Sequence, residues 1–277
     1  MRPSLQKKFT TILFADDTTF VASDVDYNFL VNTVTDELDA IKKWTEVNRL
    51  SLNNDKTNAM CFSNRMKVNE GDSSIVFNEQ FIKYEKVVKF LGVHVDDRCK
   101  FDFHIDLICR KISKVAGILY RLRSCVPEFV LIRIYYSLVY PYLIYCNTVW
   151  GGTSLTHTKR LLLLQKRIVR NITKSEFLDH TDPLFRKTGI LKISDIHRYL
   201  LSIYVFKNKD HFLSHENIHN YATRNKSKLC PLFQRLDLSQ RCVEFSGSLI
   251  WNSLPSNIVN LKSLSSFKKE IKSYFVS

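Results

Sequence analysis

The sequence predicts an α+β protein in which a small antiparallel sheet comes first and an all-helical region follows. Two observations support this prediction. Short runs of apolar and β-branched residues, separated by turn-forming residues, fill the chain to about residue 98. Beyond that position, apolar residues recur every three or four residues over long stretches, which is the spacing of an amphipathic helix. With 277 residues the chain can form a real core and about two domains.

The segment KFTTILFADDTTFVAS (residues 8–23) predicts a β-hairpin around two adjacent acids, Asp16 and Asp17. A solvated turn is one interpretation, because short carboxylates bond the local backbone. The strand period of two places Ile12, Phe14 and Asp16 on one face, so that Asp16 ends an apolar row at the edge of a buried sheet. Charges there are costly without a cation, and hard divalent cations prefer carboxylate oxygens. A turn and a metal site both remain open.

The rest of the first hundred residues predicts a mixed βαβ region followed by a small hairpin. Residues 26–53 show helical spacing, with Asp24 or Asp26 as the N-cap and an end before NRLSLNNDKT (48–57). NAMCFSN (58–64) and residues 73–97 predict short strands, and KFLGV (89–93) opens one of them. The helix has an apolar stripe made of Phe29, Leu30, Val34, Leu38, Ile41 and Trp44.

Two later helices are predicted to have an apolar back and a basic front. The first buries a stripe from Ile105 to Leu119, and the second spans LTHTKRLLLLQKRIVRNIT (155–173). Between them, residues 129–150 are apolar enough to resemble a membrane span, but Arg133 and Pro141 interrupt them, so a buried helix that breaks near Pro141 is predicted instead. The basic fronts comprise Lys111, Lys114 and Arg121 on the first helix and Lys159, Lys166, Arg167 and Arg170 on the second.

The net charge of +14 is concentrated in the second half of the chain. Residues 1–88 hold 11 Lys and Arg against 13 Asp and Glu, whereas residues 159–277 hold 21 against 9. This basic region predicts a polyanionic partner, although charge alone does not separate RNA, DNA and anionic lipid. The seven cysteines are scattered without a C-x-x-C pair, which indicates reduced thiols and a location in the cytoplasm and nucleus.

Taken together and in this order, five motifs resemble the reverse transcriptases of non-LTR retrotransposons, the jockey-like mobile elements. FADD in a hairpin is followed by an amphipathic helix, LSLNNDKT and KFLGV, which is the order of the rear part of that family's palm domain. Downstream, RIYYSLVYPYLIYCNTVW and LLLLQKRIVRNI look like the family's helical thumb and tail, and FSGSLIWNSLP (245–255) is a near-terminal signature.

The resemblance implies a division of labour among these residues. Asp16 and Asp17 would bind catalytic Mg²⁺, while Asn53 and Lys56 would lie near the triphosphate of the incoming nucleotide, with Lys56 assisting the leaving group. Phe90, Leu91 and Gly92 would form the primer grip. Partners would be an RNA template, a DNA primer and deoxynucleotide triphosphates, with no membrane involved. The basic helix fronts, including Lys111, Lys114, Arg121, Lys166 and Arg170, would hold phosphates without reading sequence.

The sequence also departs from the family. Another metal-binding aspartate and the fingers precede FADD in relatives, whereas only fifteen residues precede Asp16 here. We therefore expect a truncated polymerase: a palm remnant (1–98), a thumb-like helical region (99–175) and a basic helical C-terminal region (176–277). The isolated chain would be inactive without the missing N-terminal half.

Two other functions share features with this sequence. A Walker-type ATPase also places an acid after an apolar strand, but it needs a G-x-x-x-x-G-K-[ST] loop, and none of the seven glycines is followed by lysine. The stronger alternative is a non-enzymatic nucleic-acid-binding remnant in which the helical half binds RNA or DNA and the FADD hairpin is inert.

Overall fold

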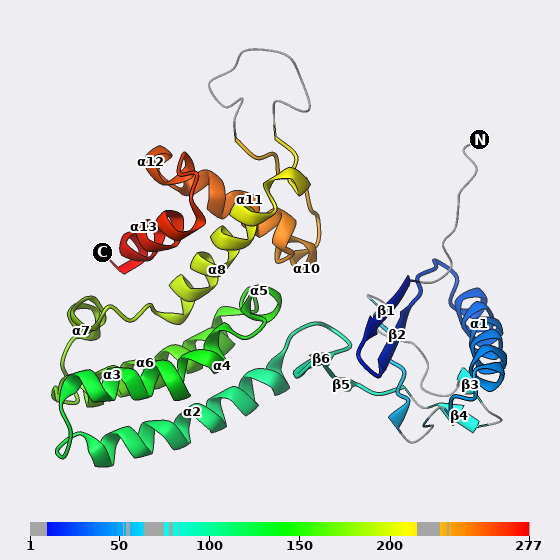
Figure 1. The fold of residues 1–277 in the computed structure, drawn as a ribbon, viewed down its shortest axis with the longest axis horizontal. Helices are drawn as coiled ribbons and strands as arrows, with labels where there is room; N and C mark the ends of the chain where they lie inside the picture. Colours follow the sequence, from blue (N-terminus) through cyan, green and yellow to red (C-terminus); the bar gives the residue numbers. More distant parts are fainter. Residues whose placement is uncertain are drawn as a thin grey trace. The chain divides into compact units, whose positions relative to one another are not determined.

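The computed structural model describes residues 10–51, 53, 56–63, 75–77, 80–82, 84–214, 228–231 and 233–276. The chain forms two compact units, Met1–Val88 and Lys89–Ser277 (Figure 1). The first combines short strands with one long helix, and the second is helical from Asp102 onward. The α+β class is therefore confirmed, while the three-part division at residues 98 and 175 stays a prediction.

In its described residues, the first unit contains two small antiparallel hairpins and one α-helix. Asp26 begins the helix, as its side chain accepts a hydrogen bond from the backbone N–H of Phe29 at 3.0 Å. The predicted strand at residues 58–64 is wrong, because in its described part only Ala59 forms an isolated bridge, to Tyr84. The elements are β1 (Thr10–Phe14), β2 (Asp17–Val21), α1 (Tyr27–Val47), β3 (Ile75–Phe77) and β4 (Gln80–Ile82).

Helix α1 confirms the helix predicted from the apolar spacing. Its length is as predicted, and it packs against β3. In its apolar stripe, Phe29 and Trp44 are 48% and 60% exposed. A three-residue strand is too short to cover the apolar face of a 21-residue helix, so this face remains available to other protein surface.

The second unit starts with a hairpin that leads directly into a long helix. Strands β5 (Val87–Phe90) and β6 (Val93–Asp96) pair with each other. The carboxylate of Asp96 accepts hydrogen bonds from the backbone N–H groups of Lys100 at 3.0 Å and Phe101 at 2.5 Å. These bonds fix the connection between β6 and the helix that starts at Asp102.

The helices of this unit surround one main core. Helices α2 and α6 pack along each other (Figure 1), and the stripe predicted on α2 is buried throughout. The elements are α2 (Asp102–Leu122), α3 (Glu128–Leu138), α4 (Tyr140–Ile144), α5 (Asn147–Trp150), α6 (Leu155–Thr173), α7 (Thr181–Thr188), α8 (Ile193–Lys207), η2 (Lys209–His211), α10 (Asp237–Gln240), α11 (Val243–Ser253), α12 (Ser256–Val259) and α13 (Leu264–Val276).

The segment that resembled a membrane span folds into the three short helices α3, α4 and α5. Pro141 lies in the first turn of α4, where a missing N–H is tolerated, so the predicted break near this proline is confirmed. In the described part of the chain, no helix combines the length and apolarity needed to cross a bilayer.

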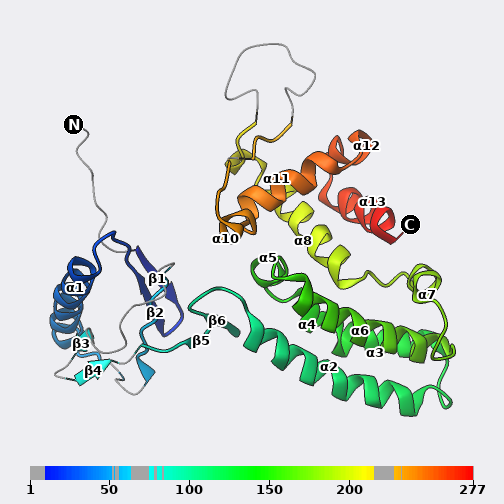
Figure 2. The same ribbon diagram turned by 180° about the vertical axis from the view of Figure 1, so that it is seen from behind.

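A smaller core joins the C-terminal half of α8 to α11 and α13 (Figure 2). The Phe267 ring stacks on Phe206 with centroids 4.4 Å apart and on Trp251 at 5.7 Å. A Cβ at Gly247 would lie 3.0 Å from a methyl group of Val205, so this glycine lets α11 approach α8 closely. Residues of the FSGSLIWNSLP motif thus form this core.

Buried polar groups tie the main core together. The fully buried Gln165 amide on α6 donates to the hydroxyl of Tyr135 on α3 at 2.9 Å and to the Leu191 carbonyl at 3.1 Å. Its oxygen accepts from the backbone N–H of Ile193 at 2.7 Å, at the start of α8. One side chain therefore links three helices.

A pair of glycine substitutions tests this packing. A Cβ at Gly151 would lie 2.5 Å from His197 Nδ1 and 2.6 Å from the Asn147 carbonyl, so Gly151→Ala should lower the free energy of unfolding by about 2–3 kcal/mol. The matched control, Gly117→Ala in α2, meets no atom within 4 Å and should raise it by roughly 0.5–1 kcal/mol. Denaturant titration measures both, and equal effects would contradict this packing.

Candidate metal hairpin and nucleic-acid interface

The two adjacent aspartates lie at the tip of the β1–β2 hairpin. The strands pair in register from Thr10 with Val21 to Phe14 with Asp17, which leaves Ala15 and Asp16 as a two-residue loop. Ala15 has a φ of 52°, a conformation that costs a residue with a side chain roughly 1–2 kcal/mol. A glycine would avoid this cost, so the strained turn points to a constraint beyond local stability.

Asp16 does not continue the face of Ile12 and Phe14, although the strand period had predicted this. Strand β1 ends at Phe14, so counting by twos does not extend to Asp16. The register instead places Asp17 directly opposite Phe14, on the face that also carries Ile12. That face is not a buried sheet edge within the chain, because Ile12 is 41% and Phe14 59% exposed.

The donor chemistry of the hairpin suits a hard divalent cation. Both carboxylates are exposed at one tight turn, and carboxylate oxygens are the ligands that Mg²⁺ prefers. In the described ranges, no group of three or more His, Cys, Asp or Glu side chains gathers at one place. In the described residues, Asp16 and Asp17 thus offer two carboxylates, and their role as metal ligands stays a prediction.

Lys56 lies after α1, in a short turn shaped by Asn53. The side-chain oxygen and the carbonyl of Asn53 both accept from the backbone N–H of Lys56 at 3.2 Å. The hydroxyl of Thr57 also donates to the Asn53 carbonyl, at 2.9 Å. The Lys56 side chain is exposed and thus accessible to an anion, and its role near a triphosphate stays a prediction.

The Phe90–Leu91–Gly92 motif forms a strand end and a turn, where the sequence had predicted that it opens a strand. Phe90 ends β5, and Leu91 and Gly92 form the loop to β6 with φ values of 44° and 84°. Two consecutive positive φ values are typical of the type I′ hairpin turn, in which glycine is favoured.

The predicted basic residues differ in whether their side chains are exposed or bonded within the chain. Lys111, Lys114 and Arg121 are exposed on α2, and the Lys111 ammonium lies 5.0 Å from the centre of the Tyr142 ring. On α6, Lys166 is half-buried. Arg170 donates two hydrogen bonds to the Asp179 carbonyl, at 3.1 and 2.9 Å, and so fastens the connection to α7.

Sequence reasoning missed a group of rings beside the Leu91–Gly92 turn. The Tyr145 hydroxyl donates to the Leu91 carbonyl at 2.5 Å. His94 on β6 lies edge-on to Phe103, with ring centroids 5.1 Å apart, and His104 is buried behind it. Burial, together with His94 and Lys111, lowers the pKa of His104 to about 4, so its ring is neutral at pH 7. The high tyrosine content of residues 129–150 was the only sequence signal.

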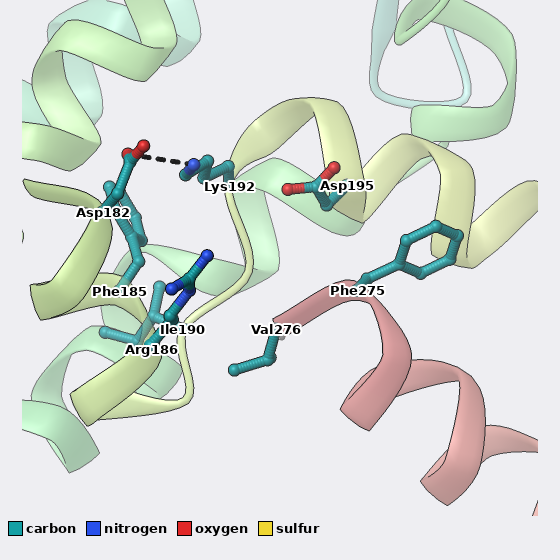
Figure 3. A pocket seen from close by; sticks show the side chains of 8 residues that line it. All are labelled: Asp182, Phe185, Arg186, Ile190, Lys192, Asp195, Phe275 and Val276. Carbon is teal, nitrogen blue, oxygen red and sulfur yellow. Dashed lines mark ion pairs between the residues drawn. The ribbon is translucent and has the colours of Figure 1, made fainter.

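A small pocket lies far along the second unit from this turn. It has a volume of about 80 Å³ and lies between α7, the start of α8 and the end of α13 (Figure 3). Lys192 and Asp182 form an ion pair of 3.0 Å at its rim. Pockets for drug-sized ligands have several times this volume, so a nucleotide would not fit.

In comparison with known proteins, the chain is similar in sequence to RNA-directed DNA polymerases of mobile elements. It is 25% identical over 185 residues to "RNA-directed DNA polymerase from mobile element jockey" of Drosophila melanogaster, an alignment that covers 66% of this chain and 20% of that protein. It is also 25% identical over 195 residues to "Probable RNA-directed DNA polymerase from transposon X-element" of the same organism, covering 69% and 21%.

The family resemblance seen in the motifs is thereby confirmed. The chain spans about a fifth of the length of the curated relatives that it matches. No protein-family model matches the sequence. No solved structure matches it significantly.

Buried histidines should make the second unit sensitive to acid. Burial lowers the pKa of His197 to about 4, and its Nδ1 lies 3.0 Å from Asn147 Oδ1. Between about pH 6.5 and 4 the unfolded chain binds a proton that the folded chain refuses, so stability falls as the pH falls. We expect the loss from pH 7 to 4.5 to be smaller by up to about 3 kcal/mol in His197→Gln.

The same denaturant titrations on His180→Gln, which changes an exposed histidine, provide the control. This variant should lose as much stability between pH 7 and 4.5 as the unchanged protein. If His197→Gln lost as much stability between pH 7 and 4.5 as the unchanged protein, the lowered pKa of His197 would be contradicted.

Proposed function

We propose that this chain supplies the metal-binding hairpin and the primer-holding helical unit of an RNA-directed DNA polymerase. The observation that carries the proposal is the β1–β2 turn, which holds Asp16 in a strained two-residue loop and Asp17 next to it at the start of β2. The relationship to mobile-element polymerases supports it independently.

The hairpin would hold Mg²⁺ through both carboxylates. When bound, paired ions would stabilise the attacking and leaving oxygens of nucleotidyl transfer. The chain's own contribution is to keep two anionic side chains close at a turn, with Lys56 available to neutralise a departing pyrophosphate. The remaining ligands would come from a part of the polymerase outside this chain, consistent with the fifth of the relatives' length that it spans.

The helical unit would bind the template–primer duplex. Residues 89–277 hold 30 Lys and Arg against 14 Asp and Glu, a balance of +16. On α2 the lysines are exposed opposite a fully buried apolar stripe, so their ammonium groups are free to contact phosphates. Such contacts follow the backbone of a nucleic acid without reading its bases.

Salt dependence tests the helical unit. An RNA–DNA hybrid should bind the chain without sequence preference, and its affinity should fall steeply between roughly 50 and 200 mM salt because bound phosphates release counterions. Lys111→Gln and Lys114→Gln should each reduce the slope of log affinity against log salt by about one. Fluorescence anisotropy of a labelled hybrid measures this slope.

Lys43→Gln is the matched control, since it removes an equally exposed lysine from α1 in the first unit. It should leave the slope unchanged. An affinity independent of salt, or a strong preference for one short sequence, would contradict binding through phosphates.

Primer extension tests the hairpin. With the rest of the polymerase supplied as a second fragment, the mixture should extend a DNA primer on an RNA template with deoxynucleotides and Mg²⁺. Asp16→Asn or Asp17→Asn should each slow extension on the order of a thousandfold or more, because each removes a carboxylate from the metal site. The observed strand pairing gives no reason to expect a larger loss of rate from Asp16→Asn than from Asp17→Asn. Lys56→Ala should slow extension less.

Asp39→Asn, an exposed change on α1, should leave extension unchanged. The 277-residue chain alone should not extend the primer. If Asp16→Asn and Asp17→Asn retained full activity in the mixture, the hairpin would not be the metal site. Salt-dependent binding together with no response of either variant to Mg²⁺ would favour the non-enzymatic alternative.

A further inference from the structure

The Leu91–Gly92 turn is held to the helices by a side chain from 54 residues away. The Tyr145 hydroxyl donates to the Leu91 carbonyl at 2.5 Å. The same ring lies against Gly92, where a Cβ would be 3.4 Å from both Cε1 and the hydroxyl oxygen. Tyr145 thus contacts both loop residues while its own side chain stays half exposed.

Tyr145 is in turn fixed from behind. It ends α4, and its carbonyl accepts a hydrogen bond from the indole nitrogen of Trp150 at 2.8 Å. Trp150 is fully buried, and its ring lies edge-on to His104 on α2, with centroids 5.7 Å apart. The hydroxyl that contacts the turn is therefore anchored in the main core.

A second contact reaches the hairpin at β6. The backbone N–H of His94 points at Nδ1 of His104, at 3.4 Å. This contact requires Nδ1 to be without hydrogen. The lowered pKa of His104 keeps the ring neutral at pH 7, so that one of its two nitrogens can accept a hydrogen bond. The hairpin is therefore fastened at its turn by Tyr145 and along its second strand by His104.

The surface beside the fastened turn has the chemistry that binds a nucleic-acid strand. Lys111 lies over Tyr142, three residues before Tyr145. Burial, together with Lys89 and Lys111, lowers the pKa of His94. Phe103 is exposed beside His94. A cation for phosphate and an exposed aromatic ring for bases or sugars are thus placed by the helices and β6 that hold the Leu91–Gly92 turn.

We propose that Tyr145 is a positioning residue that locks the Leu91–Gly92 turn to the helices, so that the turn and Lys111 contact one nucleic-acid strand as a fixed surface. This inference rests on the proposed function, because it names the residue that orders the strand-binding surface. A mobile turn would lose conformational entropy on binding, and Tyr145 removes that cost in advance.

Tyr145→Phe tests the proposal because it deletes a single oxygen atom and keeps the ring against Gly92. Hydrogen exchange of the backbone amides of residues 90–94 should become faster. The affinity for a fluorescein-labelled RNA–DNA hybrid should fall about three- to tenfold, and the slope of log affinity against log salt should fall by up to about one because the strand loses contact with Lys111. Tyr120→Phe, on the exposed surface near the other end of α2, is the matched control and should change neither quantity.

A double-mutant cycle separates positioning from a merely structural role. Lys111→Gln should weaken binding less in the Tyr145→Phe background than in the unchanged protein, because a released turn no longer presents the strand to Lys111. Additive effects, or faster exchange with unchanged affinity, would overturn the proposal. If exchange were unchanged in Tyr145→Phe, the lock itself would be refuted. If the unchanged protein did not bind the hybrid at all, the proposed function would fail, whatever the exchange result.

Discussion

The packing of the helical unit depends on the buried side-chain amide of Gln165, which hydrogen-bonds polar groups from neighbouring segments. Gln165 joins α6 to Tyr135 on α3 and to both ends of the connection that leads into α8. An apolar residue there would leave the Leu191 carbonyl and the Ile193 N–H buried without partners, at a cost of roughly 1–3 kcal/mol each. This requirement admits few arrangements of the three helices, whereas apolar packing alone tolerates sliding.

The frame built around Gln165 is what gives the β5–β6 hairpin a defined place. Helix α8 contacts α4 and α5, and these short helices carry Tyr145 and Trp150. His197 on α8 approaches Asn147 at the start of α5, in a space that only a glycine at position 151 leaves open. The packing of the core therefore determines where the Leu91–Gly92 turn lies, through a series of contacts that each contribute little stability.

Strained backbone marks both turns that the proposed function uses. Ala15 and Leu91 each adopt a positive φ where glycine would be less costly. In the β5–β6 turn, the bond from Tyr145 compensates for that cost. The FADD turn is exposed in the described structure, so a bound cation or adjoining protein surface is the natural source of compensation.

The sequence by itself determined the elements whose information is local. The stripe from Ile105 to Leu119 predicted α2, and Pro141 predicted the break after α3, because helix period and proline geometry act within a few residues. The hairpin around Asp16 was predicted for the same reason. Only the tertiary structure decided which residues of the two strands pair. Side chains alternate between faces only within a strand, and the sequence did not show where the strand ends and the turn begins. It alone revealed Gln165 and Tyr145 as links, because their partners lie about 30 and 54 residues away. Hydrogen bonds over such separations depend on how the helices pack, and no local pattern encodes that.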